Sequence, residues 1–172
     1  YPIYNLPYLH RTRILDLRSR GINAIGEIPE DFPLSETQLK HKEAVDRGQP
    51  MIDLPAIQKE LDKLEFPLSF LDYETYGPGL PFFPGYRPYQ AIVYQYSLHV
   101  LEEEGGELKH FELLLTGRKD PGKRFIEGLI RDLPDAGSVV VWNQPFEGGK
   151  NAEMAERYPA YAEELLEINQ RI

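Results

Sequence analysis

The sequence contains no cysteine, and among its 172 residues there are only four histidines and one tryptophan. The absence of cysteine excludes a disulfide scaffold, a thiol nucleophile and any zinc or iron–sulfur site held by cysteine. No apolar run approaches the ~20 residues that a membrane-spanning helix needs. No charged leader followed by an apolar stretch is visible either, so we expect a cytoplasmic protein.

Basic residues are also scarce, because 19 Lys and Arg face 28 Asp and Glu and give a net charge of -9. Residues 1–65 hold 9 basic and 11 acidic residues, and residues 66–172 hold 10 and 17. This balance argues against electrostatic binding of nucleic acid over a broad surface, because such binding needs many cations. The length suits one domain, or one domain plus an appendage, and 41% hydrophobic residues are enough to bury a core.

The periodicity of apolar residues divides the chain into a helical segment and a mixed segment. Residues 1–65 are predicted to form a helical connecting segment. Beyond it we expect strands over 68–73, 91–101, 108–115 and 138–142, and helices over 120–133 and 146–157. The order β-β-β-α-β-α predicts an α/β fold, a mixed sheet with helices on its faces. The fourth strand follows a helix and should run parallel to the first.

The strongest local signal is a pair of carboxylates, Asp72 and Glu74, near the end of an apolar strand. Strand alternation places both side chains on one face, about 7 Å apart along the strand. Two like charges at this distance are unfavourable unless a cation lies between them. Mg²⁺ and Mn²⁺ prefer carboxylate oxygens and are natural partners. The alternative is a strand that emerges into solvent, with two hydrated carboxylates.

A second signal follows the last predicted strand, where Asn143 lies in a short polar turn and Glu147 opens a helix. Ligand sites in layered α/β folds gather beyond the carboxyl ends of strands. We therefore expect Glu147 to lie within about 8 Å of Asp72 or Glu74, close enough for shared metal ligation. The alternatives are a carboxylate stabilised by a helix N-terminus for Glu147 and an ordinary turn residue for Asn143.

The loop after the first strand is rich in proline and aromatic residues. Its candidate substrate contacts are Tyr76, Phe82, Phe83, Tyr86 and Arg87. Exposed aromatic rings can stack on nucleic-acid bases, at ~1–3 kcal/mol each. The favoured alternative is a loop that packs onto its own domain, because four prolines stiffen it.

Two motifs carry a resemblance to known enzymes. They are Asp72-Tyr73-Glu74-Thr75 and Trp142-Asn143 with Phe146-Glu147. They resemble the first two motifs of the DEDD exonucleases, RNase H-like nucleases that also share the β-β-β-α-β-α order. A bacterial domain-of-unknown-function family of this type is closer still. That closer resemblance is carried by Pro88-Tyr89-Gln90, the segment from Gln95 to His99, and Asp120-Pro121.

The resemblance implies a nuclease that hydrolyses phosphodiester bonds in the manner of 3′–5′ exonucleases. In the DEDD exonucleases the carboxylates hold two divalent metal ions, Mg²⁺ or Mn²⁺, that activate water and steady the leaving oxygen. Asp72, Glu74 and Glu147 would be the catalytic metal ligands here, with Asn143 in support. Glu147 departs from the exonuclease pattern, which has Asp at this position.

The third exonuclease motif, which supplies a general base and a last Asp, is not in this sequence. The chain begins with Tyr1 and is expected to be a piece of a longer protein. The resemblance implies nucleic acid, DNA or RNA, as the partner of that longer protein, and a RecB-like nuclease region fused to it. The alternative function is a non-catalytic RNase H-like module that binds nucleic acid or a partner protein.

Overall fold

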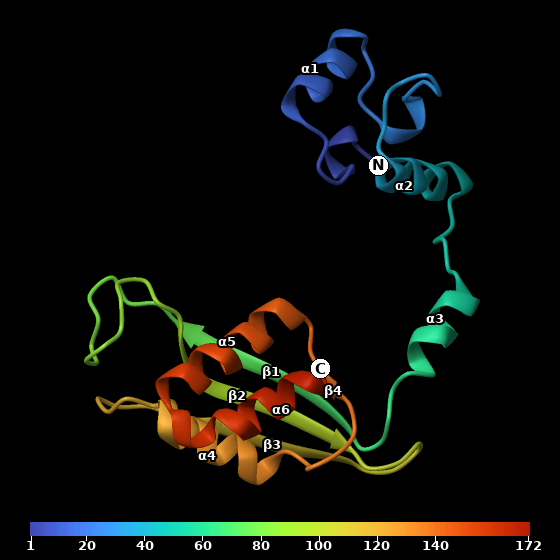
Figure 1. Cartoon of the computed structure of the whole chain (residues 1–172). Helices are drawn as coiled ribbons and strands as arrows, with labels where there is room; N and C mark the ends of the chain where they lie inside the picture. Colours follow the sequence, from blue (N-terminus) through green and yellow to red (C-terminus); the bar gives the residue numbers. More distant parts are fainter. The chain divides into compact units, whose positions relative to one another are not determined.

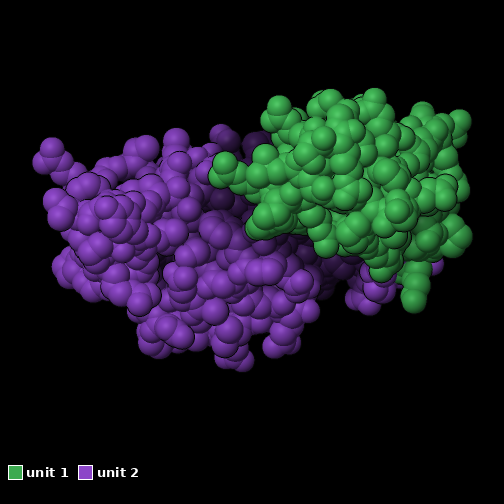
Figure 2. All heavy atoms as spheres, turned by 90° about the horizontal axis from the view of Figure 1, so that it is seen from above, with its two compact units in different colours: residues 1–59 green, residues 60–172 purple.

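The computed structural model describes residues 1–172 and divides them into two compact units, residues 1–59 and residues 60–172 (Figure 2). The division lies close to the boundary between residues 65 and 66 that the sequence suggests. Helix α3 (Leu54–Leu61) spans the division between residues 59 and 60. No helix in the structure is long and apolar enough to cross a membrane.

Unit 1 is helical, as its sequence pattern predicts. It contains α1 (Arg11–Ser19), α2 (Glu36–Arg47) and two short 3₁₀ turns, η1 (Ile3–Asn5) and η2 (Ile25–Glu27). Helix α2 begins at a capping box in which the Ser35 side chain accepts a hydrogen bond from the Gln38 backbone N–H. Such a box satisfies N–H groups that have no partner within the helix. The unit has its own small core, formed by Ile3, Leu6, Leu17, Ile25, Ile28 and Phe32.

Unit 2 is built on a four-stranded mixed sheet. Its strands are β1 (Leu68–Tyr76), β2 (Ile92–Leu101), β3 (Leu108–Leu114) and β4 (Val139–Val140). Their order is β3-β2-β1-β4, with β2 antiparallel to both β1 and β3 and β4 parallel to β1. The predicted mixed α/β class and the parallel fourth strand are therefore confirmed. Strand β4 is shorter than predicted.

Helices α4 (Gly122–Asp132), α5 (Gln144–Arg157) and α6 (Ala162–Gln170) lie together on one face of this sheet (Figure 1). A third 3₁₀ turn, η3 (Pro159–Tyr161), joins α5 to α6. The core between the helices and the sheet is centred on Phe125 of α4. Its ring meets Tyr73 and Tyr96 edge to face, with centroids 5.2 and 5.5 Å apart. Such aromatic pairs add stability beyond the area that they bury.

The other face of the sheet carries no helix, which differs from the predicted helices on both faces. Along β1, Leu71 and Tyr73 are buried under the helices, whereas Phe70, Asp72 and Glu74 are exposed. This alternation follows from the two-residue period of a strand. We call the uncovered side the open face; it also carries exposed residues of β3.

Candidate functional site

The two carboxylates of the first motif lie together on the open face, as strand alternation predicts. Asp72 and Glu74 are both exposed. In the sheet register Phe70 is opposite Val140, the last residue of β4, so β1 continues past the end of its parallel neighbour. Both carboxylates therefore come after the point where the chain of β4 leaves the sheet and turns toward α5. The turn contains Trp142, whose side chain is 97% exposed.

Asn143 occupies the N-cap position of α5 and contributes through its backbone. Its carbonyl oxygen accepts hydrogen bonds from the N–H groups of Phe146, at 2.7 Å, and Glu147, at 3.3 Å. Its side chain makes no capping hydrogen bond. This places Glu147 in the first turn of α5, as predicted, where the helix dipole favours a negative charge.

Glu147 lies in the buried layer between the sheet and α5, with only 2% of its surface exposed. Its neighbour on β1 is Tyr73, the residue between the two exposed carboxylates. Burial raises the pKa of Tyr73, its hydrogen bond to Asn151 works against this, and the negative charge of Glu147 raises the pKa further. The Oε2 atom of Glu147 is buried without any hydrogen-bond partner.

A chain of side-chain amides continues from Tyr73 into α5 and α6. The Tyr73 hydroxyl donates to Oδ1 of Asn151 at 2.9 Å, and Nδ2 of Asn151 donates to Oδ1 of Asn169 at 2.8 Å. Nδ2 of Asn169 then donates to the carbonyl oxygen of Gly148 at 2.9 Å. These bonds join β1, α5 and α6 around Glu147, yet none of them reaches its Oε2 atom.

The structure does not gather the three predicted ligands into one metal site. Asp72 and Glu74 belong to the open face, and Glu147 belongs to the helix-covered layer beside Tyr73. No group of three or more His, Asp or Glu side chains is placed to hold a metal ion. The physical reason is the strand period, because the residue of β1 that faces α5 is Tyr73.

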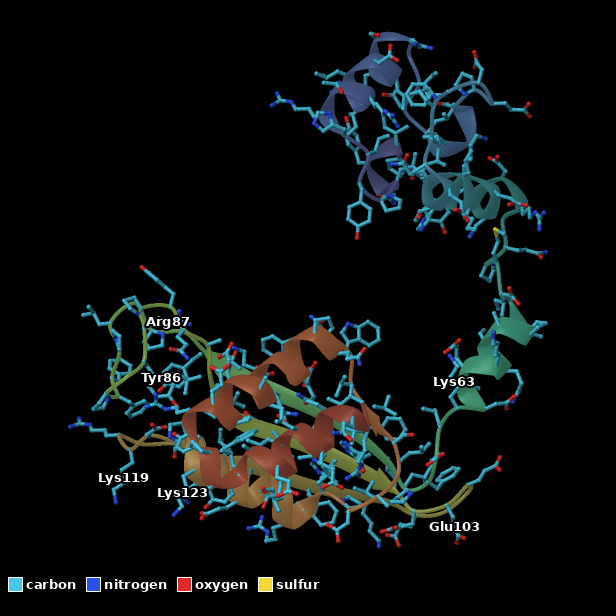
Figure 3. All side chains as sticks on the ribbon, viewed as in Figure 1. Lys63, Tyr86, Arg87, Glu103, Lys119 and Lys123 are labelled. Atoms are coloured by element: carbon cyan, nitrogen blue, oxygen red, sulfur yellow. The ribbon has the colours of Figure 1, made fainter.

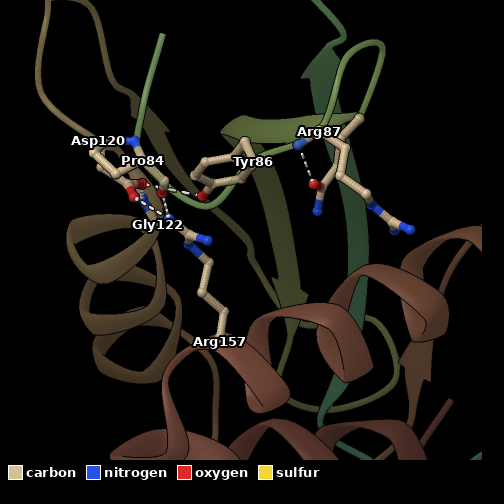
Figure 4. Close-up of polar contacts among 7 residues, drawn as sticks. Pro84, Tyr86, Arg87, Asp120, Gly122 and Arg157 are labelled. Carbon is tan, nitrogen blue, oxygen red and sulfur yellow. Dashed lines mark hydrogen bonds and ion pairs between the residues drawn. The ribbon is translucent and has the colours of Figure 1, made fainter. Parts of the chain in front are cut away.

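The aromatic loop between β1 and β2 is fixed to the helices by Arg157 of α5 (Figure 4). The Arg157 guanidinium lies 3.7 Å from the ring centroid of Tyr86 and donates to the carbonyl oxygen of Pro84 at 2.7 Å. It also pairs with Asp120 at 3.2 Å, and the Tyr86 hydroxyl donates to the same carboxylate at 3.1 Å. Tyr86 is therefore a packing residue of the loop, the alternative that the sequence favoured.

The remaining candidate contacts divide into buried and exposed residues. Phe83 is 8% exposed, and Tyr76 packs edge to face on Tyr94 with ring centroids 5.7 Å apart. Phe82 is 70% exposed, and Arg87 is exposed as well. Tyr89, which the sequence places among the aromatic residues of this loop, is 79% exposed. An irregular loop has no period from which exposure could be predicted.

Asp120 is expected to make the stability of unit 2 sensitive to acid. Burial acts to raise the pKa of Asp120, but hydrogen bonds from the Gly122 N–H, Arg157 and Tyr86 outweigh it and lower the pKa. A carboxyl whose pKa is lowered by folding adds stability above its unfolded pKa of ~3.9, and that stability is lost as the pH falls through the folded value.

Asp120→Asn should therefore lower the free energy of unfolding at pH 7 by about 1 kcal/mol, a figure reduced because the site is partly exposed. The difference from the parent should shrink as the pH falls from about 4 toward 2. Urea unfolding at pH 7 and pH 3 measures both values, with Glu107→Gln at an exposed position as the control. An equal difference at the two pH values would exclude this role.

Comparison with known proteins places unit 2 within one family. Neither the curated proteins nor the solved structures contain a match. Residues 69–172 match the family described as a domain of unknown function, DUF2779. The matched segment begins at the second residue of β1, includes every site residue described above, and covers more than half of the chain. The chain therefore belongs to the DUF2779 family.

Proposed function

We propose that unit 2 is a nuclease-type domain of RNase H-like topology, which hydrolyses phosphodiester bonds, and that Asp72 and Glu74 are its central acidic pair. The strand order β3-β2-β1-β4, with β4 parallel to β1, is compatible with that topology. The acidic pair stands near the carboxyl end of a central strand, the part of an α/β sheet where ligand sites usually gather.

The observation that carries the proposal is the unpartnered carboxylate oxygen of Glu147. Leaving a buried polar atom without a partner costs free energy, and a carboxylate is among the most costly cases. Buried polar groups in native proteins are nearly always hydrogen-bonded, so an exception calls for an explanation. Four buried side-chain atoms of this chain lack a partner, and the one carboxylate oxygen among them belongs to Glu147, the residue that the second sequence motif singles out. A functional role for Glu147 explains why this cost is retained.

The described side chains provide an incomplete ligand set for a divalent metal ion. Asp72 and Glu74 offer carboxylate oxygens of the kind that Mg²⁺ and Mn²⁺ prefer, and they are exposed on one face. Glu147 does not join them in a group of three. The proposal therefore assigns no chemical step to a bound metal ion. Cleavage measured with and without EDTA tests whether the reaction depends on a metal ion.

A non-catalytic binding module is the second candidate, and the open face favours it. On this face Phe70 is 40% exposed and Leu114 is 56% exposed. Apolar side chains gathered on one uncovered face are typical of an interaction surface. The missing three-ligand group also agrees with this candidate.

Cleavage of labelled single strands separates the two candidates. The protein is incubated with 5′-labelled DNA and RNA oligonucleotides in Mg²⁺ or Mn²⁺, and parallel samples contain excess EDTA. We expect products shortened from the 3′ end, formed at least about 100-fold more slowly in EDTA, since the loss of one transition-state stabiliser often costs this much. Binding without cleavage would support the non-catalytic module, and cleavage unaffected by EDTA would contradict the metal-dependent nuclease.

A further inference from the structure

One end of unit 2 is basic, although the unit as a whole is acidic. Residues 117–124 contain four cationic side chains and one acidic residue, Asp120, whose carboxylate is engaged by Arg157. Lys123 forms an ion pair with Glu127 at 3.6 Å. The other three cationic side chains, which make no ion pair, are Arg118, Lys119 and Arg124.

The aromatic loop lies at this same end of the sheet. Figure 3 shows Tyr86, Arg87, Lys119 and Lys123 near one another, at the end opposite Glu103. Tyr86 and Arg87 come from the loop after β1, Lys119 comes from the segment that leads into α4, and Lys123 lies in the first turn of α4. Their proximity brings cations and aromatic rings together, the combination with which proteins hold single-stranded nucleic acid.

A cavity of about 210 Å³ opens between these two segments. Its walls include the rings of Tyr76, Phe83 and Tyr94, and Lys119 lines it as well. At about 30 Å³ per water molecule, the cavity could hold roughly seven waters, and it is smaller than the ~300–1,000 Å³ typical of drug-sized ligands. It therefore suits one flat ring system, stacked on aromatic walls with a cation beside it.

The loop presents two further aromatic rings in a fixed conformation. Tyr89 has a φ of 60°, and its N–H donates to the carbonyl oxygen of Pro78 at 2.9 Å. Glycine at position 77 allows a close approach of the two ends of the loop, because a Cβ atom there would lie 3.0 Å from the carbonyl oxygen of Tyr89. Together with the Arg157 contacts, this geometry holds the 70% exposed Phe82 and the 79% exposed Tyr89 in place. A preorganised loop loses little conformational entropy when it binds.

We propose that this end of unit 2 binds single-stranded nucleic acid. One base stacks in the cavity against Tyr76, and adjacent bases stack on Phe82 and Tyr89. Lys119 and the other unpaired cations contact the phosphates. Unpaired bases are required, because a base within a duplex cannot present its flat face to a side chain. The proposal rests on the proposed function and names its substrate class.

The position of the cavity on β1 agrees with this substrate. Tyr76 follows Glu74 by two residues on the same strand, which is about 7 Å along it. A base held against Tyr76 therefore lies near the acidic pair along β1. The local cations also explain how an acidic domain could hold a polyanion, because contacts to phosphate are short-ranged at physiological salt.

Fluorescence anisotropy with fluorescein-labelled oligodeoxythymidylate and oligouridylate tests the proposal. The titrations contain EDTA, so that binding is measured apart from any metal-dependent cleavage. The double variant Phe82→Ala, Tyr89→Ala should bind both probes at least about 10-fold more weakly than the parent, because two stacking surfaces are lost. Both side chains are largely exposed, so thermal unfolding should match the parent. Tyr4→Ala, at an exposed tyrosine of unit 1, is the matched control and should leave binding unchanged.

A charge reversal tests the phosphate contact independently. Lys119→Glu should weaken binding and reduce the dependence of log K on log salt by about 0.7 or more, the value for one lost contact to a single strand. Lys63→Glu, at an exposed lysine paired with Glu60, should leave the salt dependence unchanged. The DNA and RNA probes also show whether either sugar is preferred.

Three results would overturn the inference. They are no binding of single strands by the parent protein, equal binding by the parent and the double variant, and equal affinity for a duplex of the same length. Failure of the proposed function would give a different result from failure of this inference, because single strands would then bind but would not be cleaved. Cleavage that survives in the double variant with unchanged binding would overturn only the present inference.

Discussion

Replacing Gly137 by alanine is expected to lower the free energy of unfolding of unit 2 by about 2–5 kcal/mol. Gly137 has a φ of 83°, and a Cβ atom there would lie 2.1 Å from the carbonyl oxygen of Pro67. The left-handed conformation costs alanine ~1–2 kcal/mol, and overpacking adds ~1–3 kcal/mol. The clash is with backbone that hydrogen bonds hold in place: the Ser138 N–H donates to Glu65 and the Ser69 N–H donates to Ser138.

Gly105 provides the matched control. Its φ of 73° is similar, but a Cβ atom there would meet nothing within 4 Å. Gly105→Ala should therefore lose only the conformational part, about 1–2 kcal/mol. Urea unfolding gives the free energy of unfolding of each variant, and the difference between the two losses is the cost of the close contact between residue 137 and Pro67. Equal losses in the two variants would show that the close approach does not limit this site.

The topology of unit 2 could be predicted from local patterns. The turn at Gly105 and Gly106 joins β2 and β3, and the helix between β3 and β4 makes β4 parallel to β1. The extent of β4 could not be predicted in the same way. Val141 and Trp142 continue the apolar run, but only two residues pair with β1. The chain leaves the sheet there to begin α5, which apolar periodicity does not reveal.

The uncovered face of the sheet also escaped prediction. Phe70 is apolar, yet it remains 40% exposed on the open face. A strand pattern states which residues share a face, but it does not state which face the helices cover. That choice depends on packing between elements far apart in the sequence.

The candidate site, too, could be predicted only in part. The shared face of Asp72 and Glu74 follows from strand alternation, and the place of Glu147 in the first turn of α5 follows from the turn before it. The environment of Glu147 does not follow, because it depends on contacts such as the hydrogen bond between Tyr73 and Asn151, which are 78 residues apart. Whether the three carboxylates act together remains a prediction.

Asp72→Asn is expected to reduce phosphodiester cleavage by at least about 100-fold, because it removes a charge at the proposed catalytic centre while preserving the shape of the side chain. Glu147→Gln should also reduce cleavage, but without loss of stability. It replaces a buried, unpartnered carboxylate by a neutral amide, which costs less to bury. Unchanged cleavage by Glu147→Gln would show that Glu147 has no role in the reaction.

Glu112→Gln is the matched control for Asp72→Asn. Glu112 is exposed on the open face, and in the sheet register both Asp72 and Glu112 are opposite Ser97 of β2. The variant therefore removes a carboxylate from the same surface, two strands away, outside the proposed catalytic pair. If the cleavage rate depended only on the total negative charge of this surface, both variants would be slowed alike.

The most direct measurement is the rate at which a 5′-labelled single strand is cleaved in Mg²⁺ by the parent, by Glu112→Gln and by Asp72→Asn. The account predicts equal rates for the parent and Glu112→Gln, and a rate at least about 100-fold lower for Asp72→Asn. Cleavage by Asp72→Asn at the rate of the parent would contradict it.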